Sequence, residues 1–259
     1  MTRLATTEPS GHICNAEVMT DLRQRLRTVL GLAEHGAVPM LRVDPDAAVA
    51  HVTEYVSGRY TGSTFDLYGT NETLAITADD VLAVTMLSIQ VAQHNTAGIS
   101  PTAVRELDGK STQIGLLLAE LPGDRDLHTL TEAEFTEWLG PGSPGDALYD
   151  LVRHRIGFPR VATHKLLARK RPRLLPIRDT VVEGVLGMTT SQMWWRPWWE
   201  AVSGDEEIVK RLGDIRHLAA VRHLSLLRVA DIVLWMNGGP KEKQHGSVTG
   251  LLDDAAGEP

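Results

Sequence analysis

Apolar side chains recur every three or four positions along most of this chain, which is the spacing of amphipathic helices. The pattern predicts helices over Val18–Ala33, Asp44–Tyr55, Thr77–Gln93, Lys110–Leu121, Thr131–Leu139, Asp146–Arg155, Arg160–Lys170, Asp179–Leu186, Pro197–Val202, Glu206–Leu218 and Leu224–Met236. Strand-like alternation is confined to Thr64–Leu67 and Glu72–Ile76, inside a turn-rich segment at residues 57–76. We therefore expect an all-α fold with a small irregular or β insertion.

Capping residues mark several of the predicted helix starts. Thr131 is followed three residues later by Glu134, which is the spacing of a capping box. Asp179 stands where the next predicted helix begins, and aspartate is a favoured N-cap there. Residues 16–237 thus form the predicted helical domain. Residues 1–15 and 238–259 carry no motif, and we expect a flexible N-terminus and a flexible tail.

Composition excludes some classes of protein. Cys14 is the only cysteine, so neither an intrachain disulfide nor a four-cysteine iron–sulfur cluster is possible. The ten histidines form no H-E-x-x-H pattern, and we expect no metal site. No stretch approaches ~18 uninterrupted apolar residues, and the N-terminus lacks the apolar region of a secretory signal. We therefore expect no membrane contact and a cytoplasmic location.

The net charge of −7 hides one strongly basic segment. No acidic residue occurs between Leu151 and Arg178, where the basic residues are Arg153, Arg155, Arg160, Lys165, Arg169, Lys170, Arg171, Arg173 and Arg178. We call these nine residues the basic stripe. On an acidic protein, such a stripe indicates a localised site for an anion such as a nucleic-acid backbone, with a solvated helix face as the simpler alternative.

Gly157–Pro159 breaks the chain between two helical stretches of this segment. Helical spacing directs Val161, Leu166 and Leu167 inward, and it directs four cations outward: Arg160, Lys165, Arg169 and Lys170. Backbone N–H groups at such a turn can hold a phosphate, and the cations would add attraction that does not depend on base sequence.

The segment Ile156–Val182 resembles the helix-hairpin-helix and catalytic-aspartate segment of the base-excision DNA glycosylases. Without gaps, Gly157 and Pro159 fall on the two glycines of the hairpin, and Asp179 falls on the catalytic aspartate. Upstream, M-L-S-I-Q-V at residues 86–91 is similar to the family's L-S-x-Q helix, and Gln90 matches the glutamine that fills the gap left by an extruded base. The run K-L-L-A-R-K-R-P-R-L-L-P also resembles a family of uncharacterised proteins.

The resemblance implies a two-lobed, helix-hairpin-helix glycosylase-like fold. Residues of about 79–178 would form the central lobe, and the N- and C-terminal helices would form the other. It further implies that the protein binds double-stranded DNA, which would place it in the nucleoid. Asp179 would stabilise the positive charge that develops on the sugar as the base leaves. The implied DNA-binding residues are Gly157, Phe158, Arg160, Lys165, Arg169, Lys170 and Gln90.

The chain departs from the family's pattern at two positions. Pro159 replaces the second hairpin glycine and removes one N–H donor. Val161 occupies the place of the lysine that forms a Schiff base in bifunctional members, so the resemblance implies a monofunctional hydrolase. It implies no cofactor, although a monovalent or divalent cation at the hairpin remains open.

Several aromatic residues and one histidine are candidates for a base pocket: Tyr60, Phe65, His94, Trp194 and Trp195. Four of the six tryptophans lie at positions 194, 195, 198 and 199, where core packing is the favoured interpretation. Two other functions stay open. One is a helix-hairpin-helix protein that binds DNA without chemistry, and the other is a helical domain that binds a protein or a small molecule. Asp179 would then be only a helix cap.

Overall fold

The computed structural model describes residues 22–32, 45–92, 98–188 and 194–239. Residues 1–15, most of the expected tail and His94 lie outside these ranges. Residues 22–29 are helical, and they are followed by α2 (Pro45–Glu54), α3 (Ala78–Thr85), α4 (Pro101–Gly109), α5 (Ser111–Glu120), α6 (Glu132–Leu139), α7 (Pro144–Asp150), α8 (Arg160–Lys170), α9 (Thr180–Leu186), α10 (Trp195–Val202), α11 (Glu206–Leu218) and α12 (Leu226–Gly238). The predicted all-α fold is confirmed, while α4 was not predicted.

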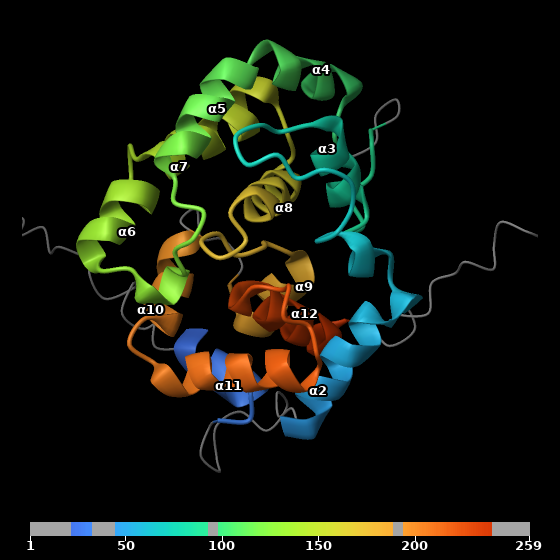
Figure 1. The fold of residues 1–259 in the computed structure, drawn as a ribbon, viewed down its shortest axis with the longest axis vertical. Coiled ribbons are helices and arrows are strands. Elements are labelled where there is room, and N and C mark those ends of the chain that lie inside the picture. Colours follow the sequence, from blue (N-terminus) through green and yellow to red (C-terminus); the bar gives the residue numbers. More distant parts are fainter. Residues whose placement is uncertain (1–21, 33–44, 93–97, 189–193, 240–259) are drawn as a thin grey trace, which may run out of the picture.

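The helices pack in two groups (Figure 1). In the upper part, α8 packs against α3 and α7, and α5 packs against α4 and α7. In the lower part, α12 packs against α2, α9 and α11. The chain crosses from the first group to the second between α8 and α9, which places the start of α9 where the two groups meet.

The expected strands in the insertion do not form. Within the described residues, the only β pairing is an isolated bridge between Val91 and Ile99. The insertion instead contains a π-helical turn at Tyr55–Arg59, a 3-10 helix at Thr61–Thr64 and further turns. Short strands need a partner strand for their backbone groups, and here buried side chains take that role, as described below.

The helix expected over Thr77–Gln93 ends early, at Thr85. Ser88 adopts a left-handed conformation with a φ of 61°, which interrupts the helix. The amide of Ala92 then donates to Ile99 O over 2.8 Å, and the Ile99 amide donates to Gln90 O over 2.9 Å. Gln90 therefore lies exposed on a non-helical segment, and the expected L-S-x-Q helix is wrong.

Two predicted helix caps are confirmed. Thr131 accepts the amide of Glu134, whose carboxylate accepts the amide of Thr131 over 2.9 Å. Asp179 accepts the amide of Val181 over 2.9 Å and so begins α9.

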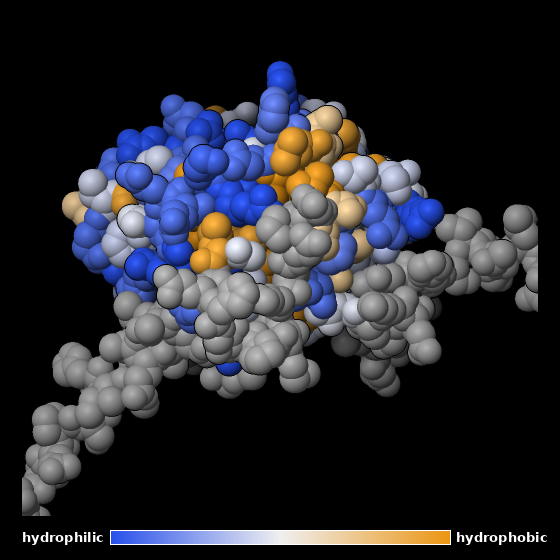
Figure 2. Space-filling view, turned by 90° about the horizontal axis from the view of Figure 1, so that it is seen from below, coloured by the Kyte–Doolittle hydropathy of each residue, from blue (hydrophilic) through white to orange (hydrophobic). Residues whose placement is uncertain are grey.

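Seen from below, the described surface is mostly hydrophilic, and its apolar residues gather in a few small areas (Figure 2). None of the helices in the described ranges combines the length and the apolar character that a bilayer crossing demands.

Candidate functional site

The centre of the basic stripe lies inside the protein. Lys165, Arg169, Lys170 and Arg171 are each 5% exposed or less. The expectation that Lys165, Arg169 and Lys170 point outward is therefore wrong, although Leu166 and Leu167 are buried as predicted. Buried cations need carboxylates or carbonyls as partners, and these partners replace the phosphates that were expected.

Asp80 is the buried counter-charge of this cluster. Its Oδ1 accepts Arg169 Nε over 2.8 Å, and its Oδ2 accepts Lys170 Nζ over 3.0 Å. The same carboxylate accepts the Thr77 amide over 2.8 Å and so stabilises the start of α3. One carboxylate thereby connects α3 to α8, and the two cations are not available to an external anion.

Arg169 and Arg171 supply the hydrogen bonds that the insertion would otherwise need from a strand. Arg169 donates to the carbonyls of Phe65 and Tyr68, and Arg171 donates to Thr73 O over 3.1 Å. Arg171 also donates to Leu121 O over 3.0 Å, at the end of α5. These contacts explain physically why the turn-rich segment is ordered without strands.

The turn before α8 has the expected helix–turn–helix form, but its amides are occupied. Gly157 has a φ of 93°, which favours glycine. The amides of Gly157 and Phe158 both donate to Val152 O, and Pro159 has no N–H. The expected phosphate cradle of Gly157 and Phe158 is therefore wrong. Arg160 remains 42% exposed, with Nη2 3.5 Å from Glu183 Oε1.

The tryptophan cluster belongs to the core, as favoured from the sequence. Its four members, Trp194, Trp195, Trp198 and Trp199, are each less than a tenth exposed. Trp194 packs beneath Arg178, with the guanidinium carbon 4.9 Å from the ring centroid. None of the four, Trp194 and Trp195 included, lines the pocket described below.

His164 lies between Trp194, Trp195 and Tyr149. Within the described part of the chain, neither ring nitrogen has a hydrogen-bond partner. Burial, together with the charges of Arg178 and Arg160, lowers the pKa of His164 from 6.5 to about 3. The imidazole is therefore neutral inside the folded protein at every physiological pH.

A His164→Phe variant should lose less stability in acid than the wild type. Between pH 6.5 and about 3 the unfolded chain takes up a proton at His164 that the folded chain does not, so the wild type is destabilised as pH falls. From pH 7 to pH 5 this costs about 2 kcal/mol. Urea unfolding of both proteins at the two pH values measures the difference. An equal loss in the two proteins would contradict the buried, neutral histidine.

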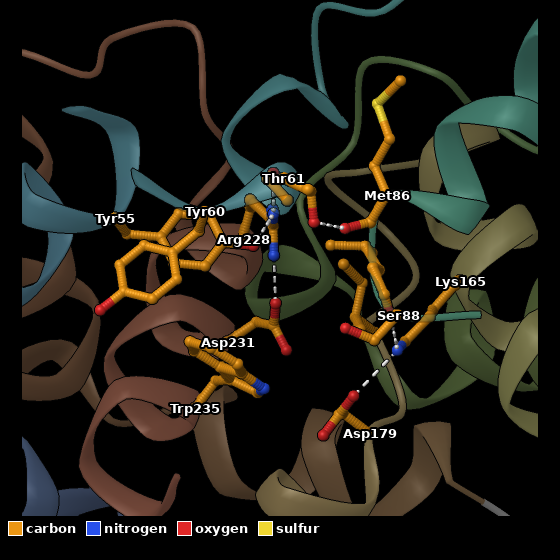
Figure 3. A pocket seen from close by; sticks show the side chains of 13 residues that line it. Tyr55, Tyr60, Thr61, Met86, Ser88, Lys165, Asp179, Arg228, Asp231 and Trp235 are labelled. Carbon is orange, nitrogen blue, oxygen red and sulfur yellow. Dashed lines mark hydrogen bonds and ion pairs between the residues drawn. The ribbon is translucent and has the colours of Figure 1, made fainter. Parts of the chain in front are cut away.

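A pocket opens where the two groups of helices meet (Figure 3). The cavity measures about 70 Å³ and is partly open to solvent. The polar and aromatic side chains of its wall come from the π-helical turn and the insertion, the segment after α3, α8, the start of α9 and α12: Tyr55, Tyr60, Thr61, Ser88, Lys165, Asp179, Arg228, Asp231 and Trp235.

Asp179 is held at one side of the pocket by two contacts. Its Oδ1 accepts the Val181 amide over 2.9 Å, and its Oδ2 accepts Lys165 Nζ over 2.8 Å (Figure 3). Lys165 Nζ also donates to Leu87 O over 2.8 Å. The side chain of Asp179 is 15% exposed. The residue is thus both a helix cap and a pocket carboxylate, and the cap alone does not account for its position.

The opposite wall is aromatic. Tyr55 and Tyr60 stack with ring centroids 5.5 Å apart and an interplanar angle of 15°. Trp235 meets both rings edge-on, with centroids 5.8 Å and 5.6 Å away. Gly62 makes this packing possible, because a Cβ there would lie 2.0 Å from the hydroxyl of Tyr55. Flat aromatic surfaces of this kind suit a planar ligand.

Arg228 organises the α12 side of the pocket. Its Nε donates to Asp66 over 2.9 Å, Nη1 donates to Asp231, and Nη2 donates to the Tyr55 hydroxyl over 3.1 Å and to Gly62 O over 3.2 Å. Burial alone lowers the pKa of Arg228, but the charges of Asp66, Tyr55 and Asp231 raise it well above its ordinary value. The guanidinium is therefore a permanent cation that bonds the carboxyl groups of both Asp66 and Asp231.

The structure brings together three of the residues singled out from the sequence, Asp179, Lys165 and Tyr60. Phe65 is buried beside Arg169 and Arg228 and does not line the pocket. Arg228, Asp231 and Trp235 were missed. Their signal is the stretch R-V-A-D-I-V-L-W, in which two charged residues three positions apart interrupt an apolar helix.

Residues 48–238 match the model of a family described as a family of unknown function (DUF6308). No curated protein and no solved structure shows significant similarity to the chain.

Proposed function

The chain belongs to the DUF6308 family, whose function is unknown, and we propose from its pocket that it hydrolyses an N-glycosidic bond. The substrate of the leading proposal is a base that has been turned out of duplex DNA, in line with the glycosylase resemblance of Ile156–Val182. The observation that carries the proposal is the place of Asp179. The aspartate that the resemblance marks as catalytic lies in the pocket, opposite an aromatic wall.

Breaking the bond between a base and its sugar develops positive charge on the sugar. Asp179 would stabilise that charge and orient the attacking water. Lys165 would act as a positioning residue, because its ammonium holds Oδ2 of Asp179 while its own place is fixed by Leu87 O. The rings of Tyr55, Tyr60 and Trp235 would hold the planar base at the other end.

Burial of the basic stripe favours a second candidate, hydrolysis of a small N-glycoside such as a free nucleoside. Internal carboxylates bind the cations of Lys165, Arg169 and Lys170. The carbonyl oxygen of Val152 accepts the amides of Gly157 and Phe158. These contacts leave Arg160 as the exposed cation among the residues expected to bind DNA. The same contacts weigh against the alternative of a DNA-binding protein without chemistry.

A base-release assay tests the proposal. The protein is incubated with duplex oligonucleotides carrying damaged, mismatched or modified bases, with the same strands unpaired, and with free nucleosides, and the released base is separated by chromatography. Release from duplexes supports the DNA glycosylase, whereas release from free nucleosides alone supports the second candidate. If no substrate loses its base, the hydrolase proposal is wrong and the pocket is a binding site only.

A further inference from the structure

The pocket contains a second carboxyl group, Asp231, that lies between Arg228 and Trp235 on α12 (Figure 3). We propose, on the basis of the proposed hydrolase function, that Asp231 is the general acid that protonates the departing base, while Asp179 faces the sugar. The reaction then uses two carboxyl groups with different tasks, which is the usual division of work in glycoside hydrolysis.

The hydrogen bonds of the two carboxyl groups assign these tasks. Both oxygens of Asp179 accept a bond, one from Lys165 Nζ and one from the Val181 amide. Both oxygens of Asp179 are therefore already occupied by donors of the protein. Asp231 differs: within the described residues, Oδ2 accepts from Arg228 and Oδ1 accepts no hydrogen bond. In Figure 3 the oxygen that is not bonded to Arg228 points away from it, toward the side of the pocket where Asp179 and Lys165 lie.

Burial favours the protonated form of Asp231, and the charges around it act in both directions. Arg228, which lies on the same helix as Asp231, donates a hydrogen bond to it. The guanidinium of Arg228 also bonds Asp66 of the insertion, so the two carboxyl groups share it. Tyr55 also bonds Arg228, while Asp179 at the start of α9 and Lys165 of α8 act on Asp231 across the pocket. Burial raises the pKa of Asp231 to about 6, Arg228 and Lys165 oppose the rise, and Asp179 adds to it. A general acid works best with a pKa near the working pH.

The bond between the sugar carbon and the base nitrogen breaks, and its electron pair goes to the base. The proton of Asp231 Oδ1 passes to the base, which leaves as a neutral molecule. Asp179 orients the water that adds to the sugar carbon, the proton lost by this water goes to solvent, and solvent returns a proton to Asp231. The net result is a free base, a sugar hydroxyl and one water molecule consumed.

Two kinds of substrate in the base-release assay test this assignment. A neutral base needs a proton to leave, whereas an N-alkylated base already carries a positive charge and leaves without one. We expect Asp231→Asn to slow release of the neutral base by about 10²–10⁴-fold and to leave release of the alkylated base nearly unchanged. Wild-type release of the neutral base should fall about tenfold per pH unit above pH 6, and the variant should lack this decline.

Asp66→Asn is the matched control, because it removes the other carboxylate of Arg228 and Asp66 does not line the pocket. It leaves Arg228 to Asp231 alone, so release of the neutral base should still decline with pH, but the decline should begin at a lower pH than in the wild type. If Asp231→Asn slows the neutral and the alkylated base equally, Asp231 is not the acid, although the hydrolase proposal survives. If the wild type releases no base, the hydrolase proposal fails, and the role of Asp231 fails with it.

Discussion

Replacing Asp179 by asparagine should lower the rate of base release by about 10²–10³-fold while the protein stays folded. The size of the loss follows from removing a charge that stabilises the developing sugar cation within the pocket. Asparagine caps a helix about as well as aspartate, so the amide of Val181 keeps a partner. The buried Lys165 loses its counter-charge but keeps its bond to Leu87 O, so the protein loses part of its stability and remains folded. Single-turnover rates with saturating protein measure the chemical step, and circular dichroism reports the fold.

Asp205→Asn is the matched control for this variant. Asp205 caps α11 by accepting the Ile208 amide over 3.1 Å, and it pairs with Arg27 over 2.9 Å. It thus repeats the cap and the ion pair of Asp179 at a place outside the pocket. Base release by Asp205→Asn should match the wild type. An Asp179→Asn protein that releases base at the wild-type rate would show that the carboxylate takes no part in the chemistry.

Replacing Asp80 by asparagine should lower the free energy of unfolding by about 3–5 kcal/mol. Asp80 is fully buried and is the carboxylate that both Arg169 and Lys170 contact. Its removal leaves two buried cations without a counter-charge, and transfer of an unpaired charge into the interior is costly. Urea denaturation followed by tryptophan fluorescence measures the change.

Asp126→Asn provides the comparison for Asp80. Asp126 makes two hydrogen bonds to Arg173, of 3.0 Å and 2.6 Å, but this pair lies in contact with solvent. Loss of the Asp126–Arg173 ion pair should lower the free energy of unfolding by less than about 1 kcal/mol. Equal costs for the two variants would mean that the buried cluster contributes no more than a surface ion pair, contrary to its place in the core.

Local rules predicted those parts of the fold that depend on neighbouring residues. Apolar spacing located α8 and α11 at their observed bounds, and capping chemistry located the starts of α6 and α9. The end of α3 was not predictable in this way. There, bonds to Ile99 and the left-handed Ser88 override a helical pattern of apolar residues.

The direction of the basic residues was the main error, and it has a physical cause. Sequence spacing treats lysine and arginine as surface residues, which they are unless partners exist inside. Those partners lie far away in the sequence: Asp80 is 89 positions from Arg169, and Phe65 is 104 positions away. Asp179 was found because a motif marks it, whereas Asp231 was not, because its role depends on the meeting of α8, α9 and α12.

The burial of Lys165, Arg169 and Lys170 has a consequence for any complex with DNA. The affinity of a DNA complex falls with added salt in proportion to the number of phosphates that the protein neutralises, because each contact releases condensed counterions. Cations that lie inside the protein contact no phosphate and therefore release no counterions. A duplex bound to this protein would therefore contact it through few phosphates, and the affinity would depend only weakly on ionic strength. The shape of the extruded base would then decide most of the selectivity.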